Sequence, residues 1–365
     1  MDRDSQEITY LNTAAVGLVS PESIKAAQQF QEGTKTDAIK TFGNWMENRL
    51  PQLADKTATL INANASQVAF LPNSSFGISS IVQTIQPKIN HVLLFKDDYP
   101  SLNMPFELGD FDVSYVESED GFSISLEAIQ SICKENDVEA IAISHVQFLT
   151  GFTLDIEALG NFCREAGIVL ILDATQSMGA LEIDFENLDI DVLISSSYKW
   201  LNGGLGSGVM AVKDAFMQKF PPRIAGFGSM EHADNGWSYQ HSAASYQPGH
   251  LNPLGLLQLE KAVEKRLSDG VTSVQKHNQS LVKKLASGLR NSSFKIIGGN
   301  DLNNLSTILC FEADETVHDW LEKQGISVTH RKGAIRVSPH FYNSPEDIDH
   351  LLNTLEAYEN SITKS

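Results

Sequence analysis

A single lysine stands where an apolar run ends and a glycine-rich loop begins. The segment "DVLISSSYKWLNGGLGSG" passes from aliphatic residues through three serines to Lys199 and then into a cluster of glycines. In a crevice of low dielectric, a lysine has a lowered pKa, and its neutral amine can form a Schiff base with an aldehyde. The alternative is a surface lysine whose stem lies along the protein. The glycines favour the reactive lysine, because they let the backbone approach a ligand closely.

A carboxylate ends another apolar run. Asp173 closes "IVLILD", where burial of its charge is costly unless a cation or hydrogen-bond donors meet it. One suitable partner is a protonated ring nitrogen, as in a pyridoxal cofactor whose ring acts as an electron sink. An aspartate that caps the following helix fits the same position, so both interpretations stay open.

Small hydroxyl residues stand at an expected helix start. In "PNSSFGISSIVQTI", Ser74 and Ser75 fall in the first turn, where free backbone N–H groups and the helix dipole favour an anion such as phosphate. A Ser or Asn cap without any ligand also fits. This stretch taken alone favours the simple cap.

Short apolar runs alternate with amphipathic segments through the first two thirds of the chain. This alternation predicts an α/β fold with a doubly wound, mainly parallel sheet. The expected strands cover residues 68–71, 91–95, 111–116, 140–146, 168–173, 192–195 and 208–212.

Ligands of such a sheet bind beyond the carboxyl ends of the strands. The residues that follow the expected strands should therefore face one crevice. They are Asn73, Ser74, Ser75, Asp97, Asp98, Tyr99, Asp173, Gln176, Ser196, Tyr198 and Lys199.

The alternation stops near Pro253, which can begin a long helix that runs past Arg266. We therefore expect a large domain over residues 21–252 and a smaller C-terminal α+β domain over residues 253–365. A chain of 365 residues is also longer than one hydrophobic core usually supports.

Composition narrows the classes of partner and site. With 27 Lys+Arg against 46 Asp+Glu, the formal charge of −19 repels nucleic acid and anionic membrane surfaces, so neither partner is expected. The first residues lack the basic leader and apolar core of a signal peptide, and no apolar run is long enough to span a bilayer.

Cysteine and histidine usage bears on compartment and metals. The three cysteines are far apart and have no metal-ligand spacing, which indicates reduced thiols and a cytoplasmic location. The ten histidines show no zinc spacing, so no metal site is expected. The glycine cluster is followed by the strand-like "VMAV" rather than a helix, which disfavours a nicotinamide-binding loop.

Several motifs together resemble a known family. "YLNTAAVG", "DDYPSLNMPF", "LDATQSMGALEIDF", "SSSYKWLNGG" and "IRVSPHFYNSPEDID" are similar to segments of the class V aminotransferase family of fold-type I pyridoxal-phosphate enzymes. That family includes cysteine desulfurases, kynureninases and isopenicillin N epimerase-like proteins. The resemblance runs from Tyr10 to the end of the chain, and it implies that residues 1–20 contribute to the small domain and the active site.

The resemblance implies pyridoxal 5'-phosphate as cofactor and assigns roles around its ring. Lys199 would form the Schiff base and move the proton of the substrate's α-carbon. Asp173 would bind the pyridinium nitrogen, Gln176 the phenolic oxygen, and Tyr99 would stack on the ring.

The resemblance also implies residues for the phosphate and the substrate. The phosphate would be held by Ser74, Ser75, Ser196 and Tyr198, with His250 reaching it from the second subunit of a homodimer that shares its active sites. Arg336 would bind the carboxylate of a small amino acid in a bidentate pair, and Asn12 would line the substrate pocket.

Differences from the family's sequence pattern indicate which branch of the family the chain belongs to. "GISVTHRKGAIR", the stretch before Arg336, holds no cysteine, which argues against a cysteine desulfurase. We expect an aminotransferase. A kynureninase-like lyase or an epimerase with the same cofactor stays open, as does a protein of another class that keeps the fold for binding without catalysis.

Overall fold

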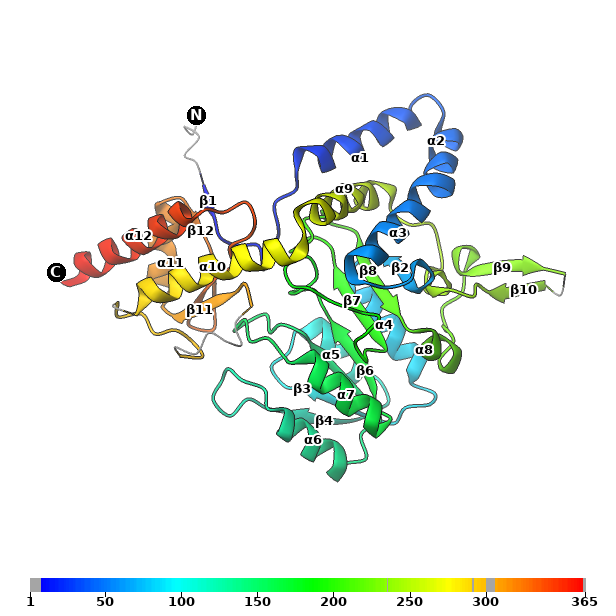
Figure 1. Ribbon diagram of the computed structural model, residues 1–365, viewed down its shortest axis with the longest axis horizontal. Coiled ribbons are helices and arrows are strands. Elements are labelled where there is room, and N and C mark those ends of the chain that lie inside the picture. Colours follow the sequence, from blue (N-terminus) through cyan, green and yellow to red (C-terminus); the bar gives the residue numbers. More distant parts are fainter. Residues whose placement is uncertain (1–7, 235, 291, 300–305, 364–365) are drawn as a thin grey trace.

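A seven-stranded sheet forms the centre of the protein (Figure 1). The computed structural model describes residues 8–234, 236–290, 292–299 and 306–363. The strand order is β2-β8-β7-β6-β5-β3-β4. The strands are β2 (Val68–Leu71), β3 (His91–Phe95), β4 (Asp112–Val116), β5 (Ala140–Ser144), β6 (Val169–Asp173), β7 (Val192–Ser196) and β8 (Gly208–Val212).

One strand departs from the parallel arrangement. β8 runs antiparallel to both of its neighbours, β7 and β2, while the pairs from β7 to β4 are all parallel. Two reversals cancel, so β2 points the same way as β7. The predicted α/β fold with a mainly parallel sheet is confirmed, and the carboxyl ends of β2, β3, β5, β6 and β7 meet at one edge.

Helices cover both faces of the sheet. Successive side chains of each strand point to opposite faces, so each face packs against its own helices in a separate hydrophobic core. In β3, for example, Leu93 belongs to one core and Leu94 to the other. α4 and α5 pack together on one side, and α6 and α7 on the opposite side. These helices are α4 (Ser74–Ile85), α5 (Pro100–Glu107), α6 (Leu126–Glu135) and α7 (Ile156–Ala166).

The helix ends follow local sequence signals. Asp155 caps α7 by accepting a hydrogen bond from the backbone N–H of Ala158, and Gly167 ends that helix in a left-handed conformation with φ of 72°. Ser125 caps α6 in the same way as Asp155 caps α7. At α4 the cap is Asn73, which leaves the following serine hydroxyls available for other contacts.

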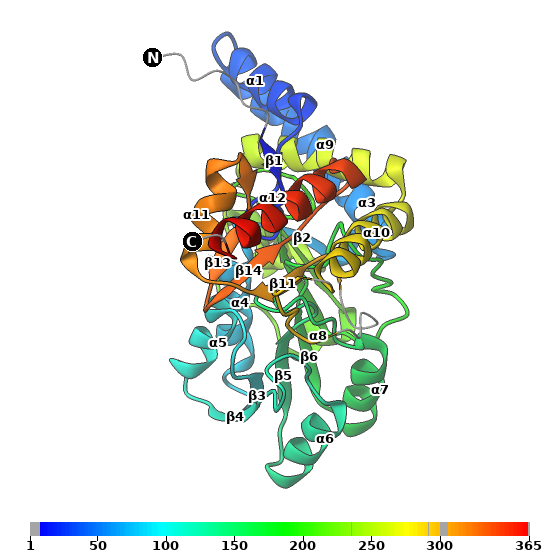
Figure 2. The ribbon, with the colours of Figure 1, turned by 90° about the vertical axis from the view of Figure 1, so that its left-hand side faces the viewer.

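The C-terminal part of the chain is built around a three-stranded antiparallel sheet of order β11-β14-β13. α11 and α12 lie side by side over it (Figure 2). The elements of this C-terminal part are α9 (Pro253–Asp269), α10 (Val271–Leu289), β11 (Leu309–Glu312), α11 (Glu315–Lys323), β12 (Ile326–Ser327), β13 (Thr329–Arg331), β14 (Ala334–Val337) and α12 (Pro345–Thr363).

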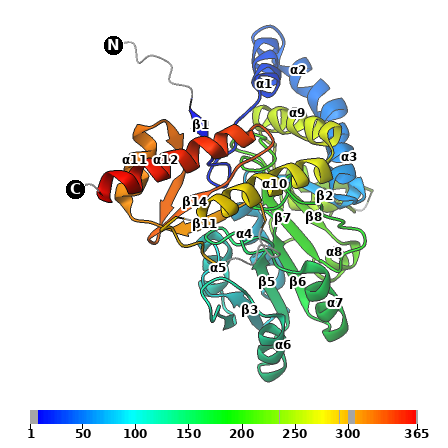
Figure 3. The same cartoon turned by 60° about the vertical axis from the view of Figure 1, so that its left-hand side comes forward.

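The N-terminal residues join this C-terminal part. β1 (Thr9–Tyr10) pairs in parallel with β12, and it lies beside the C-terminal elements in Figure 3. The chain then passes to α1 (Pro21–Thr34), α2 (Ala38–Asn44), a π-helical turn (Trp45–Arg49) and α3 (Leu50–Ile61). α1 packs on α9.

The remaining elements are short. β9 (Met230–Ala233) and β10 (Gly236–Tyr239) pair antiparallel and project from the body at the right of Figure 1. The others are α8 (Asp214–Lys219) and 3₁₀ turns at Ala65–Gln67, Phe227–Ser229 and Ala243–Tyr246. Across the described residues, no helix is both long and apolar enough to cross a membrane.

Gly17 lies against the turn that carries Lys199. Its backbone N–H donates a hydrogen bond of 2.7 Å to the carbonyl oxygen of Tyr198. A Cβ atom at this position would lie 2.1 Å from the carbonyl oxygen of Lys199, well inside van der Waals contact. Glycine is therefore required here for the close approach of two backbones.

We expect Gly17→Ala to lower the free energy of unfolding by about 1–3 kcal/mol, because the added methyl group overpacks this contact. Urea denaturation measures the difference. Gly43→Ala is the matched control, since its added Cβ meets nothing within 4 Å on α2. Equal stability of the two variants would contradict the close packing of Gly17.

Candidate active site

The amine of Lys199 is buried in the turn after β7. The residue is 6% exposed, and its Nζ lies 5.4 Å from the ring centroid of Tyr99 and 5.8 Å from that of Tyr198. Burial lowers the pKa of Lys199 to about 8, although the nearby charge of Asp173 raises it in part. A substantial fraction of this amine is therefore neutral and nucleophilic a little above neutral pH.

Asp173 is the last residue of β6 and is also buried, with 4% exposure. Burial raises the pKa of Asp173, while hydrogen bonds from Thr175 and the charge of Lys199 oppose that rise. The backbone N–H of Thr175 donates to Oδ1 at 2.8 Å. The carboxylate thus holds the turn that follows β6 and stands close enough to Lys199 to influence its charge.

Two serines from different strand ends form a hydroxyl pair at the start of α4. The backbone N–H of Ser74 donates to Oγ of Ser196 at 2.9 Å, and the Ser196 hydroxyl donates to Oγ of Ser74 at 2.9 Å. Both residues are buried, and Ser75 beside them is half-buried. Hydroxyls at the N-terminus of a 12-residue helix suit an anion, because the helix dipole adds to their donors.

Arg336 occupies β14 and points toward the same region. The residue is 3% exposed, and its Nη1 donates to the carbonyl oxygen of Phe148 at 2.6 Å. Its Nε is buried and has no hydrogen-bond partner. Burial lowers the pKa of Arg336 to about 10, so the group stays charged with an unused donor. An acidic group of a ligand would satisfy it.

Two other predicted site residues have contacts within the protein. Gln176 donates to the carbonyl oxygen of Ala14 at 3.1 Å and accepts from the indole N–H of Trp200 at 2.7 Å. Asn12 accepts a hydrogen bond of 2.6 Å from the hydroxyl of Thr329. These contacts tie the N-terminal segment to the site, and the predicted ligand roles of both residues stay predictions.

His250 packs against aromatic rings from α2 and from the 3₁₀ turn at Phe227–Ser229. It is exposed, and its ring is 5.2 Å from that of Phe42 and 6.4 Å from that of Phe227. Its expected contact with a phosphate on a second subunit stays a prediction.

Two buried residues at the same sheet edge have no role in the sequence-based assignment. Asp98 accepts hydrogen bonds from the backbone N–H (2.9 Å) and the hydroxyl (2.5 Å) of Ser144, and burial raises the pKa of Asp98 to about 6. His145 follows β5, is 5% exposed, and has an Nδ1 with no hydrogen-bond partner. Burial lowers the pKa of His145 to about 4, so its ring is neutral. The expected strand 140–146 included His145, whereas β5 ends at Ser144, so the strand-end rule did not reach this residue.

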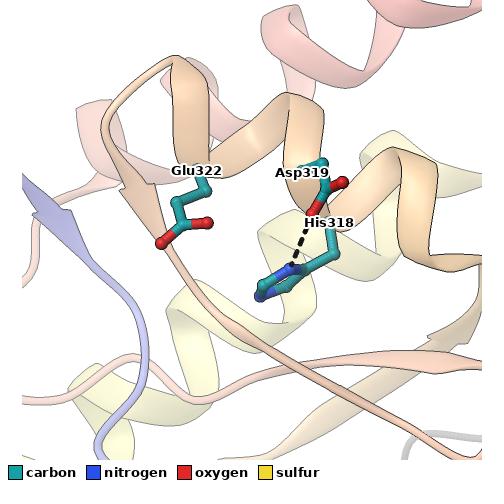
Figure 4. Close-up of side chains that lie close together, drawn as sticks. All are labelled: His318, Asp319 and Glu322. Atoms are coloured by element: carbon teal, nitrogen blue, oxygen red, sulfur yellow. Dashed lines mark ion pairs between the residues drawn. The ribbon is translucent and has the colours of Figure 1, made fainter.

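A separate acidic cluster on α11 carries no site. His318, Asp319 and Glu322 lie within 4.8 Å of one another (Figure 4), but both carboxylates are exposed and no further group points to an ion.

Comparison with known proteins identifies the family. The family model described as "Aminotransferase class-V" matches residues 9–351. The chain belongs to the class V aminotransferase family. Its cofactor is pyridoxal phosphate.

The relatives named for an activity differ among themselves. A probable cysteine desulfurase from Pyrococcus abyssi is 23% identical over 99% of this chain and 96% of its own length. An uncharacterized aminotransferase from Bacillus subtilis, YcbU, is 24% identical over 86% of this chain and 85% of its own. A solved cysteine desulfurase from Thermococcus onnurineus NA1 superimposes with a TM-score of 0.87 at 20% identity, covering 96% of this chain and 94% of its own, which shows a shared fold.

The argument against a cysteine desulfurase is wrong. Several of the similar proteins, including the relatives above from P. abyssi and T. onnurineus, bear that name. The argument considered only the chain neighbours of Arg336, whereas strand pairing decides which residues surround it. In the β11–β14 ladder, Cys310 is the direct partner of Arg336.

The residues present fit the cofactor of the family. A buried amine suits its aldehyde, a buried carboxylate at a strand end suits its ring nitrogen, and hydroxyls at a helix N-terminus suit its phosphate. The site supplies these groups in Lys199, Asp173 and the Ser74–Ser196 pair.

We expect the Lys199 amine of the cofactor-free protein to titrate with a midpoint near pH 8, because burial disfavours the ammonium form. Acetic anhydride labelling across a pH series, followed by mass spectrometry of the peptide, measures this midpoint. Asp173→Asn should lower the midpoint further, since the carboxylate stabilises the charged amine. A midpoint above about 10, the range of an ordinary lysine, would show that the amine is not buried in solution.

Proposed function

We propose that the protein is an aminotransferase that acts on a small amino acid with pyridoxal phosphate. The observation that carries the proposal is the combination of a buried amine with a lowered pKa and a buried arginine with an unused donor. Lys199 and Arg336 provide these two groups, and the charge of Arg336 is one of those that lower the pKa of Lys199. Lys199 would hold the cofactor that receives the amino group of a substrate, and Arg336 would hold the substrate's carboxylate, so together they serve the two groups that every amino acid carries.

The charge of each residue in the site suggests its role toward the cofactor or the substrate. The cofactor, when bound, supplies an aldehyde and a ring that withdraws electrons from the α-carbon of the substrate. Asp173 would keep the ring nitrogen protonated, because a cation satisfies its buried carboxylate. Arg336 would bind the substrate carboxylate through its guanidinium and orient the α-carbon.

Lys199 would carry the proton. Its neutral amine accepts a proton from the α-carbon, and the resulting ammonium returns it to a different atom when an amino group is to be transferred. A pKa of about 8 suits this exchange, since both forms of the amine are populated within reach of neutral pH. The ring of Tyr99, near Nζ, would limit access of water to the amine.

Removal of sulfur from cysteine is the second candidate. It is favoured by the names of similar proteins, several of which are cysteine desulfurases. Both reactions use the same receptor for the substrate's α-amino and carboxylate groups, so the fate of the side chain distinguishes them.

Product analysis separates these activities. With ¹⁵N-labelled L-alanine, L-aspartate or L-glutamate as donor and a keto acid acceptor, we expect NMR to show the label in the aminated acceptor for at least one donor. L-cysteine, in contrast, would give alanine and transferable sulfur if the second candidate is correct. Lys199→Ala should lower turnover by roughly 10²–10⁴-fold, the usual loss of a general acid–base group. Lys323→Ala, an exposed lysine on α11, is the control.

A defined set of results would refute the proposed enzyme activity. If the folded protein binds the cofactor but transfers the label from none of these donors, leaves cysteine unchanged, and exchanges the α-proton of none of these amino acids in heavy water, the proposal fails. A binding protein of the same fold would then remain.

We also propose that the protein is a homodimer whose subunits share active sites. The support is the exposure of His250 beside Phe227, itself 76% exposed. If His250 serves the second subunit, mixing Lys199→Ala with His250→Ala protein should restore activity to heterodimers, in which one site is complete. No recovery after subunit exchange, verified by mass spectrometry of the dimers, would exclude a shared site.

A further inference from the structure

A cavity of about 240 Å³ lies between the carboxyl ends of β3 and β5 and the β13–β14 hairpin. Its wall combines apolar and polar side chains from five parts of the chain. The residues used below are Asp97, Gln147, Leu149, Thr150, Arg331 and Lys332.

Cations outnumber acids in this cavity. Lys332 and Asp97 form an ion pair of 3.1 Å, so the carboxylate of Asp97 is already matched. Arg331, next in the hairpin, forms no ion pair with any carboxylate of the described residues. In a protein with a formal charge of −19, an arginine without an acidic partner in a cavity indicates a place for an anion from outside.

The cavity continues the active site through one segment. Gln147, Leu149 and Thr150 line it, and Phe148 between them accepts the hydrogen bond of Arg336. The ring of Phe148 also lies 5.2 Å from that of Tyr99, which is the ring next to the amine of Lys199. Thr329 pairs directly with Arg336, so Arg331, two residues further on, projects from the same face of the β13–β14 hairpin as Arg336. A substrate held at Arg336 would direct its side chain along that face toward Arg331.

The charges of Arg331, Arg336 and Lys199 influence one another. The charge of Arg331 contributes to lowering the pKa of Lys199 and that of Arg336, so the three cations lie within electrostatic range of one another. A single carboxylate would match Arg336 and leave Arg331 unpaired. A substrate with two acidic groups would match both.

We propose that the substrate is an amino acid whose side chain ends in an acidic oxygen group, a carboxylate or a sulfinate, bound by Arg331 in this cavity. The proposal rests on the proposed function, because it concerns the side chain of the amino acid that this function requires. Arg336 holds the α-carboxylate, and Arg331 selects for the second negative charge. Because Arg331 is exposed, this selection weakens as salt screens the pair.

Binding of unreactive compounds tests the proposal without turnover. By calorimetry on the cofactor-loaded protein, we expect succinate and glutarate to bind at least about tenfold more tightly than their monoamides, which match them in shape but lack the second charge. Arg331→Gln should remove most of that preference. Arg164→Gln, an exposed arginine paired with Asp189 on α7, should keep it.

Substrate pairs give the second arm. L-aspartate and L-glutamate should show lower KM values than L-asparagine and L-glutamine, and L-cysteine sulfinate should join the acids if a sulfinate is accepted. Equal affinity for acids and amides would overturn the proposal. So would an equal loss of affinity for acids and amides in Arg331→Gln, because Arg331 would then bind the α-carboxylate. Tight binding of dicarboxylates without any turnover would instead refute the proposed function and leave this site standing.

Discussion

The free-energy cost of removing the Lys199 amine from water determines what surrounds it. An isolated ammonium in a protein interior is so unfavourable that the group loses its proton or acquires a partner. Lys199 does both in part, since its pKa falls to about 8 and Asp173 lies within reach of its charge. The turn around it must also be rigid, because a mobile turn would carry the amine back to solvent. Gly17 packs directly on the carbonyl of Lys199 and limits that movement.

A second buried cation fixes the loop that follows Lys199. Arg266, at the end of α9, is 1% exposed and donates to the carbonyl oxygen of Trp200 at 3.3 Å and to Oδ1 of Asn202 at 3.1 Å. His340 meets the same two acceptors through Nε2, at 2.9 and 3.0 Å. Its Nδ1 faces the amide Nδ2 of Asn278 at 3.0 Å, so Nδ1 accepts and Nε2 carries the hydrogen. Burial and the charge of Arg266 lower the pKa of His340, which keeps the ring neutral. One network thus joins α9, the Lys199 loop and the residues after β14.

Local patterns determine a large share of this fold and site. Apolar runs placed all seven strands of the central sheet, because buried parallel strands have few other compositions open to them. Asp155 and Gly167 marked the two ends of α7 for reasons confined to that helix. The strand-end rule brought Asp173, Ser196 and Lys199 to one edge, since it needs only strand direction.

What local patterns missed depends on contacts between distant segments. The amide of Gln176 donates a hydrogen bond to Ala14, 162 residues earlier in the chain, and this contact could not be read from the residues around Gln176. Asn12 likewise contacts Thr329. The local sequence around Gln176 or Asn12 does not predict these contacts, because they form only when the N-terminal segment packs over the Lys199 turn. The reversal of β8 is of the same kind, since the pairing partner of a strand is not written in its own composition.

The same distinction explains why the family could be recognised while the exclusion of one of its branches, the cysteine desulfurases, was wrong. The amine, the carboxylate at the strand end and the hydroxyls belong to short motifs, and they handle the part of the substrate that all amino acids share. In the proposed site, the side chain of the substrate meets a different wall, which Gln147, Leu149 and Thr150 form together with the β13–β14 hairpin, far away in sequence. Arg336 joins the two regions, and its neighbours across the ladder are Cys310 and Thr329 rather than the residues that adjoin it in the chain. Reaction branch is therefore a property of strand register and cavity charge, and a search of one linear segment for one residue type could not decide it.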